Sequence, residues 1–369
     1  MLNYPLALEL NAFFGSTFSR SAPSSMRAEY LDLLQKETHF AFISPNETSL
    51  QEWRETLKSE FTARKSAILT NLQSHKQTLE TRLIQKDFEA LADLALLYGN
   101  FPLALENLTK ALSYKLADSA ETDLGIEQKL LRTFYLVGDW SGIRNEPWNQ
   151  INQSQPATVA AYLAIATFQS CPLKSIEIFN RLFKVMPIGM EFEVSLVELG
   201  LCAVLCTLLS CSIGALKGWW KDSLGFQQII LCSRDSRLEN AVKSLVSGLY
   251  SQALGELEGL IRDFFVFGPD LHRKLFGHSV DSLIIQLKGA ILKGHLEMYR
   301  EIPLSECAKA LGQVELGVNQ LIEFISKWNL PFKIDQQRSM LVKCTESGII
   351  KPDLTPLDRI IIEQMFNQR

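Results

Sequence analysis

A long stretch without proline or glycine constrains the fold of this chain more than any other feature. Neither residue occurs between Glu47 and Tyr98, and apolar side chains recur there every three or four positions among charged ones. Proline and glycine are the residues that most often interrupt a helix, and this spacing puts the apolar side chains on one helix face. The stretch therefore predicts long amphipathic helices.

The next segment predicts a helix, a turn and a second helix. Gly99 permits a sharp turn, and Ala104 and Ala111 let two helices approach closely. The residues that follow the spacing of a tetratricopeptide (TPR) unit are Tyr98, Gly99, Phe101, Ala104, Leu108 and Ala111. Less regular units of the same kind occur at 134–143, 167–183 and 245–260. We therefore expect a mostly α protein built on an irregular TPR-like helical repeat array.

Composition and charge are those of an ordinary globular protein. The 369 residues are 47% hydrophobic and 21% charged, which is enough for two domains with separate cores. A formal charge of -4 provides no overall field that attracts phosphate backbones or acidic membranes. Nucleic-acid binding would therefore require a local basic patch.

The cysteines and the N-terminal residues predict a cellular compartment. Seven scattered cysteines never form a CxxC pair, so we expect reduced thiols and neither a disulfide framework nor a zinc site. The first ten residues lack the basic start and the long apolar run of a secretory signal. We expect the protein in the cytoplasm and the nucleus.

Residues 199–216 form an uncharged apolar segment that has two interpretations. Its length approaches that of a membrane helix, but it contains Thr207 and two glycines, and no second such segment exists. We favour a helix buried on all sides within a helical stack, in which Cys202, Cys206 and Cys211 act as small apolar residues.

The C-terminal third of the chain predicts a winged helix. Helices are expected over 279–299 and 313–330, with a short strand at 301–304 and another helix between them. A β-hairpin follows within 327–343, where Phe332 and Ile334 alternate with polar residues and QQRS supplies the turn. Helix, strand, helix, helix and hairpin is the order of a winged helix.

The hairpin has two candidate roles besides closing its own domain. A winged helix that reads DNA needs cations on its second motif helix, but residues 313–328 carry only Lys327 against Glu315 and Glu323. The alternative is that Phe332, Ile334, Met340 and Val342 face the core while the backbone edge pairs with a strand of another chain. The charge pattern favours pairing with a partner, and no direct contact with nucleic acid is expected.

These features together resemble the PCI family. Its members are scaffolding subunits of the proteasome lid, the COP-9 signalosome and the translation initiation factor three complex. The segments LVSGLYSQALGELEGL, LKGAILKGHLEMYREIPLSECAKALG and FKIDQQRSMLVKC are similar to the elements that lead into and form the family's winged helix. Residues 6–34 are similar to the opening helices of the signalosome member, which favours the signalosome over the lid.

The resemblance implies a domain organisation. It places a TPR-like region at 1–195, a PCI domain at 196–345 and a C-terminal tail helix at 346–369. Within the PCI domain it implies a helical part at 196–280 and a winged helix at 281–345. The tail contains TPLDRIIIEQMFNQR, whose apolar residues suit a helical bundle shared between subunits.

The resemblance also implies a function and partners. We expect a noncatalytic scaffold subunit of the COP-9 signalosome that supports cullin deneddylation by a separate metalloprotease subunit. Alternatives are a proteasome 19S lid subunit and a nucleic-acid or translation-initiation adaptor of the same family. The expected partners are other PCI subunits and the metalloprotease subunit in a hetero-oligomer, without a membrane. The expected interface residues are Lys333, Ile334, Met340, Leu341, Val342, Ile360, Ile361 and Met365.

No pattern typical of an enzyme is visible. The five histidines form no HxH or HExxH pair, and the GxxxxGK[ST] phosphate loop is absent from the sequence. GHSVD at 277–281 begins like a GxSxG motif but has Asp281 where the turn needs glycine. Trp219 and Trp220 are interpreted as packing residues, with a partner contact as the alternative. We expect no catalytic residue, no metal site and no cofactor.

Overall fold

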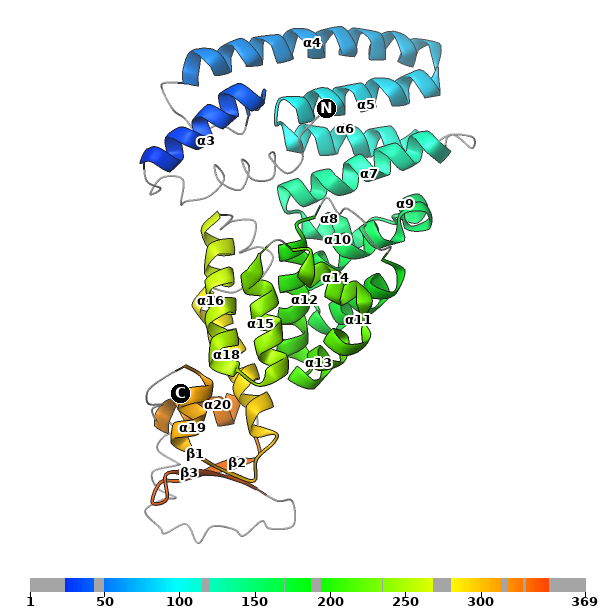
Figure 1. The fold of residues 1–369 in the computed structure, drawn as a ribbon. Coiled ribbons are helices and arrows are strands. Elements are labelled where there is room, and N and C mark those ends of the chain that lie inside the picture. Colours follow the sequence, from blue (N-terminus) through cyan, green and yellow to red (C-terminus); the bar gives the residue numbers. More distant parts are fainter. Residues whose placement is uncertain are drawn as a thin grey trace, which may run out of the picture. The chain divides into compact units, whose positions relative to one another are not determined.

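A computed structural model describes residues 24–42, 50–114, 120–168, 170–186, 194–233, 235–267, 280–312, 318–327 and 330–344. These residues form seventeen helices and one three-stranded antiparallel sheet (Figure 1). The chain divides into two compact units, Met1–Ala290 and Ile291–Arg369. The expected mostly α fold with a small sheet near the C-terminus is confirmed, while the predicted domain boundaries remain predictions.

Fourteen of the helices described lie in the first unit. They are α3 (Ser24–Glu37), α4 (Gln51–Thr78), α5 (Thr81–Leu97), α6 (Phe101–Ser113), α7 (Ala120–Val137), α8 (Trp140–Asn145), α9 (Asn149–Ser154), α10 (Pro156–Phe168), α11 (Pro172–Val185), α12 (Leu196–Ser210), α13 (Ile213–Asp222), α14 (Leu224–Leu231), α15 (Ser236–Ser247) and α16 (Tyr250–Phe267). α18 (Val280–Leu296) spans the division between the units. The second unit continues with β1 (Glu301–Pro303), α19 (Leu304–Ala310), α20 (Val318–Lys327), β2 (Phe332–Asp335) and β3 (Met340–Lys343).

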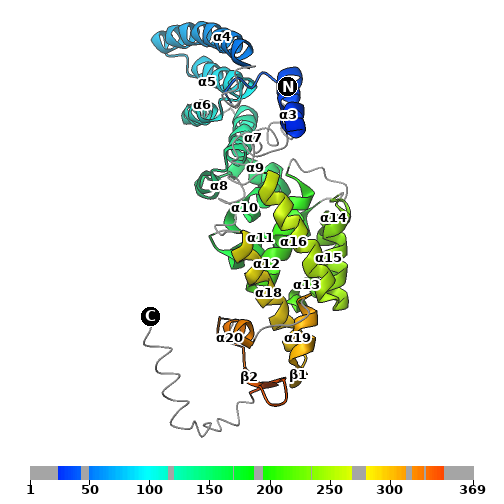
Figure 2. The same ribbon diagram turned by 90° about the vertical axis from the view of Figure 1, so that its left-hand side faces the viewer.

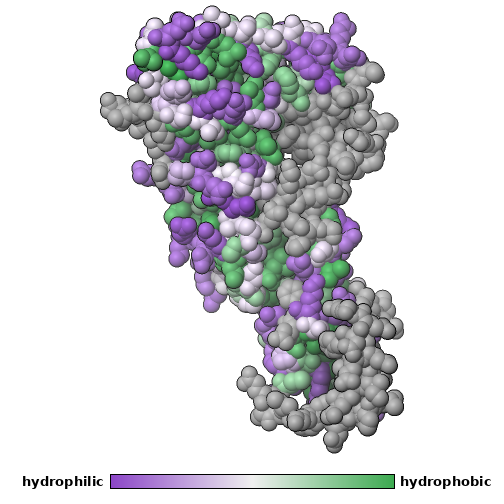
Figure 3. All heavy atoms as spheres, turned by 180° about the vertical axis from the view of Figure 1, so that it is seen from behind, coloured by the Kyte–Doolittle hydropathy of each residue, from purple (hydrophilic) through white to green (hydrophobic). Residues whose placement is uncertain are grey.

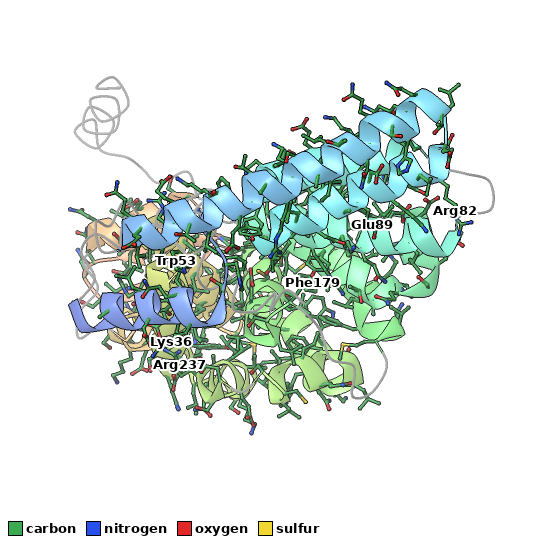
Figure 4. The ribbon with its side chains drawn as sticks, turned by 90° about the horizontal axis from the view of Figure 1, so that it is seen from above. Lys36, Trp53, Arg82, Glu89, Phe179 and Arg237 are labelled. Carbon is green, nitrogen blue, oxygen red and sulfur yellow. The ribbon has the colours of Figure 1, made fainter. Side chains whose placement is uncertain are left out.

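The stretch without proline or glycine forms two long helices, as predicted. α4 has 28 residues and ends where Leu79 adopts a left-handed backbone with φ of 57°. Its buried side chains are Leu57, Phe61 and Leu72, which recur on one face of the helix. Figure 4 shows Trp53 on α4, where it packs against the core cluster that includes Leu34 of α3.

The turn between α5 and α6 has the chemistry that the sequence predicts. Gly99 takes φ of 75°, a conformation that glycine adopts without steric cost. The side chain of Asn100 then accepts a hydrogen bond from the backbone N of Leu103 and caps α6. Ala104 and Leu108 are fully buried where α6 packs on α5. The helix, turn and helix predicted around Gly99 are confirmed.

Similar turns join later helices of the first unit. Gly138 and Gly248 also have positive φ, of 70° and 80°, where α7 and α15 end. α10 packs on α11 and α15 packs on α16, so the predicted units at 167–183 and 245–260 are helical pairs. Figure 2 shows α4 to α7 stacked in chain order. Assignment of these pairs to the TPR class stays a prediction.

The uncharged segment 199–216 is continuously buried only in its first part, and it is not one helix. Cys211 is exposed, so the prediction that it is buried as a small apolar residue was wrong. Every residue from Glu198 to Leu208 in α12 is buried. The helix ends at Ser210, and the side chain of Ser212 caps a new helix, α13, by accepting a hydrogen bond from Ala215 N at 3.3 Å. The prediction of a single helix was therefore wrong, because hydropathy alone does not register a serine cap.

No helix among the described residues is long and apolar enough to cross a membrane. Figure 3 shows hydrophilic and hydrophobic side chains intermixed on the part of the described surface that is visible from behind.

The tandem tryptophans belong to the packing of the first unit. The ring of Trp219 lies 4.9 Å from that of Phe183 and 5.6 Å from that of Phe226, measured between ring centroids. Its Nε1 donates to Asn180 Oδ1 at 2.8 Å. The interpretation of Trp219 as a packing residue is confirmed, and Trp220, which is half-buried, accepts a hydrogen bond from Gln227 at its backbone carbonyl.

The second unit has a core of its own. The ends of α18, α19 and α20 cover one face of the sheet, and Leu296, Ile302, Leu321 and Leu341 are almost completely buried there. The predicted order of helix, strand, helix, helix and hairpin is confirmed for the described residues. Ile322 of α20 points away from this core and is 49% exposed.

Candidate partner interface

The order of strands decides which edges of the sheet are open. The order is β1-β3-β2, so β3 lies in the centre and pairs with a neighbour on both sides. Met340, Leu341 and Val342 belong to β3. The prediction that their backbone forms a free edge was wrong, because β1 occupies that position in the sheet.

The two outer strands differ in what their free edges offer. Lys343 N donates to Arg300 O at 2.7 Å and Leu304 N to Ser339 O at 3.0 Å, which fixes the hydrogen-bonded positions between β1 and β3. Since these positions alternate in antiparallel pairs, Glu301 and Pro303 direct their backbone groups away from β3. Pro303 has no N–H, so the open edge of β1 is short of donors.

The open edge of β2 keeps both a donor and an acceptor. Cys344 N donates to Pro331 O at 2.7 Å, so the same alternation turns the N–H and C=O of Ile334 outward. The C=O of Phe332 also points outward, whereas its N–H bonds to Leu330 O at 2.8 Å. Among the described residues, none donates to or accepts from these groups of Ile334. β2 is therefore the edge to which another strand can be added.

The side chains of β3 have the opposite orientation to the one predicted. Leu341 is fully buried and faces Ile334 of β2 and Ile302 of β1 across the sheet. Met340 and Val342 are only half-buried and lie on the outer face. The prediction that Met340 and Val342 fill the core was therefore wrong. The predicted register differs from the observed one by one residue, and a shift of one residue exchanges the two faces of a strand.

Charges on the outer face of the sheet are balanced. An open hollow of about 580 Å³ lies there, and its charged lining consists of Lys333 and Arg338 against Glu301 and Asp335. Arg338 Nη2 lies 3.7 Å from Glu301 Oε2, and both side chains are exposed, so the pair adds little to stability. This surface does not select for a polyanion.

The remaining predicted interface residues differ in what the structure says of them. Lys333 is exposed and Ile334 is half-buried on β2, next to the open edge. Ile360, Ile361 and Met365 of the predicted tail helix lie outside the described residues. Contact of any of these residues with a partner stays a prediction.

The most strongly perturbed carboxyl group is buried in the first unit. Glu198 of α12 is 4% exposed, and burial raises the pKa of its carboxyl group to about 7. The hydroxyl of Tyr135 on α7 is hydrogen-bonded to it, and burial raises the pKa of that tyrosine well above its usual value. This pair crosslinks two helices. The sequence analysis did not identify this pair, because Glu198 directly precedes the uncharged segment and Tyr135 is 63 residues away in the chain.

Chemistry that requires a metal or a reactive thiol has little support among the described residues. They contain no group of three histidine, cysteine or acidic side chains placed to hold a metal ion. Burial raises the pKa of the Cys202 thiol, which disfavours the reactive thiolate form. Ser279 of GHSVD lies outside the described residues, and α18 begins at the next residue.

Comparison with known proteins gives no family assignment, because the sequence matches neither a protein-family model nor a curated protein.

Proposed function

We propose that this chain is a noncatalytic scaffold subunit of the COP-9 signalosome. In this role it supports the removal of a ubiquitin-like modifier from cullins, while a separate metalloprotease subunit does the chemistry. Its partners are other PCI subunits and that metalloprotease. The observation that carries the proposal is the open edge of β2 on a small sheet that follows a long array of helical pairs.

The order of elements supports the assignment to the PCI family. The helical pairs from α4 to α16 are followed by α18, β1, α19, α20 and a hairpin, which is the order that the resemblance in sequence implies. A helical array exposes a long surface, and an open strand edge adds backbone hydrogen bonds to a partner. Both features suit a subunit whose work is to hold others in place.

The second motif helix favours protein partners over nucleic acid. The exposed side chains identified on α20 are Asn319, Ile322, Glu323, Ser326 and Lys327. One cation on this surface cannot neutralise several phosphates. Residues 291–344 contain seven basic and six acidic side chains, so this part of the chain has almost no net charge with which to attract a nucleic acid. An adaptor that binds DNA or RNA through this helix is therefore the less favoured function.

Purification of the tagged chain from its own cells tests the proposal. Copurification with several PCI subunits and a signalosome metalloprotease, identified by mass spectrometry, is the expected result. Recovery of proteasome lid subunits instead would transfer the assignment to the lid. Recovery of a monomer, or of the chain with RNA or DNA, would contradict the scaffold function.

A further inference from the structure

One side of α4 carries cations around an exposed leucine. Lys65, Leu69 and Lys76 are separated by four and seven residues, which places them on the same side of a helix. Leu69, which lies between the two lysines, is 42% exposed. Figure 4 looks down on α4 and shows side chains projecting from it along its whole length.

A lysine from α6 lies close to one end of this row. Lys76 Nζ is 5.2 Å and Lys110 Nζ is 6.0 Å from the centroid of the Phe88 ring on α5. The two ammonium groups are therefore at most about 11 Å apart, although they come from different helices. Phe88 is buried and stacks on Tyr114, so the ring gives both lysines a fixed platform. We name Lys65, Leu69, Lys76 and Lys110 the basic strip.

Few carboxylates compete for these cations. Within the described part of the chain, no acidic side chain lies within ion-pair distance of Lys65 or Lys76. Lys110 pairs with Glu106 at 2.5 Å, but both side chains are about half exposed, so this pair is weak. Lys110 chiefly, through its hydrogen bond and charge, and Lys65 to a smaller extent lower the pKa of the Glu106 carboxyl. The strip is thus locally positive on a chain with a net charge of -4.

We propose that the basic strip binds an acidic segment of a partner protein. Carboxylates of that segment pair with Lys65, Lys76 and Lys110, and an apolar side chain packs on Leu69. Eleven helical residues separate Lys65 from Lys76, or about 16 Å, a distance that about five residues of extended peptide span. Because an apolar contact lies between the cations, a peptide that mixes acidic and apolar residues fits better than a polyanion.

Fluorescence anisotropy with the full-length chain tests this proposal. The probe is a labelled peptide of about ten residues made mostly of glutamate with two leucines. The double variant Lys76→Glu with Lys110→Glu is expected to bind it about fivefold or more weakly. The matched control reverses Lys36, in the last turn of α3, and Lys243, which forms an i,i+4 pair with Glu239 as Lys110 does with Glu106. The control should bind within about twofold of the unchanged chain.

A second variant separates the apolar contact from charge. Leu69→Ser should weaken binding of the peptide with leucines and leave a leucine-free glutamate peptide unaffected. Circular dichroism of each variant checks that helical content is kept. Equal binding by the unchanged chain and the Lys76→Glu, Lys110→Glu variant would overturn the proposal. Tighter binding of single-stranded DNA or of phosphatidylserine vesicles than of the peptide would overturn it as well.

Discussion

Replacing Glu198 by glutamine should reduce the sensitivity of the fold to rising pH. The folded chain raises the pKa of this carboxyl from 4.5 to about 7 through burial. Between these values the folded state holds a proton that the unfolded state has released, so the free energy of unfolding falls as pH rises. The stabilisation is complete below the unfolded pKa and is lost as pH passes through about 7. Glutamine does not ionise, so residue 198 of the variant causes no fall in the free energy of unfolding as pH rises.

The magnitude follows from the two pKa values. Each unit of difference corresponds to about 1.4 kcal/mol, so the ionised carboxyl costs the fold about 3 kcal/mol near pH 8 and about 1 kcal/mol near pH 5. Relative to the unchanged chain, Glu198→Gln should therefore gain about 2–2.5 kcal/mol in free energy of unfolding between these two pH values. The hydrogen bond to Tyr135 is kept, because an amide can donate to or accept from the hydroxyl.

Urea titrations at the two pH values measure this difference. Tryptophan fluorescence reports on the region, because the Trp140 ring lies 5.6 Å from that of Tyr135. Glu106→Gln is the control, since it removes a carboxyl from the surface of α6. If the unchanged chain and Glu198→Gln lost stability in parallel between about pH 5 and pH 8, the buried carboxyl would not be the group that titrates.

Two further pairs of variants test the fold. Leu341→Ala should lower the free energy of unfolding by about 2–4 kcal/mol because Leu341 is fully buried. Met340→Ala, on the outer face of the sheet, should lower it by less than about 1 kcal/mol. If urea titrations gave the reverse order, the strand orientation predicted from the sequence would be correct after all. Gly99→Ala should lower the free energy of unfolding by about 1–2 kcal/mol because φ of Gly99 is 75°. Gly125→Ala within α7 should raise it by up to about 1 kcal/mol, because an added Cβ meets no atom within 4 Å there. Equal melting temperatures of the two variants would contradict both expectations.

The helical pairs could be predicted because their signals are local. Gly99 and Asn100 specify a turn and a cap through their own backbone and side chains, so a single sequence reveals them. The break at Ser212 carries the same kind of signal, but the apolar residues on both sides concealed it. Local chemistry was therefore a better guide than hydropathy at this position.

The strand faces and edges could not be predicted because they depend on distant segments. Met340, Leu341 and Val342 are all apolar, so alternation allows either face of β3 to point inward. Which face of β3 points inward is determined by its position between β1 and β2. β3 takes that position because it pairs with Glu301–Pro303, which lie about forty residues earlier in the chain. For the same reason the candidate strand interface, predicted on both strands of the hairpin, is restricted to β2, although the expected hairpin was present.

The scaffold account is tested most directly by two proline variants at opposite edges of the sheet. Ile334→Pro removes the outward N–H of β2, and Glu301→Pro removes the outward N–H of β1. After purification from cells, the account predicts that Ile334→Pro loses PCI subunits from the complex while Glu301→Pro and the unchanged chain retain them, with circular dichroism unchanged in all three. Full recovery of the same subunits with folded Ile334→Pro would contradict assembly through the β2 edge.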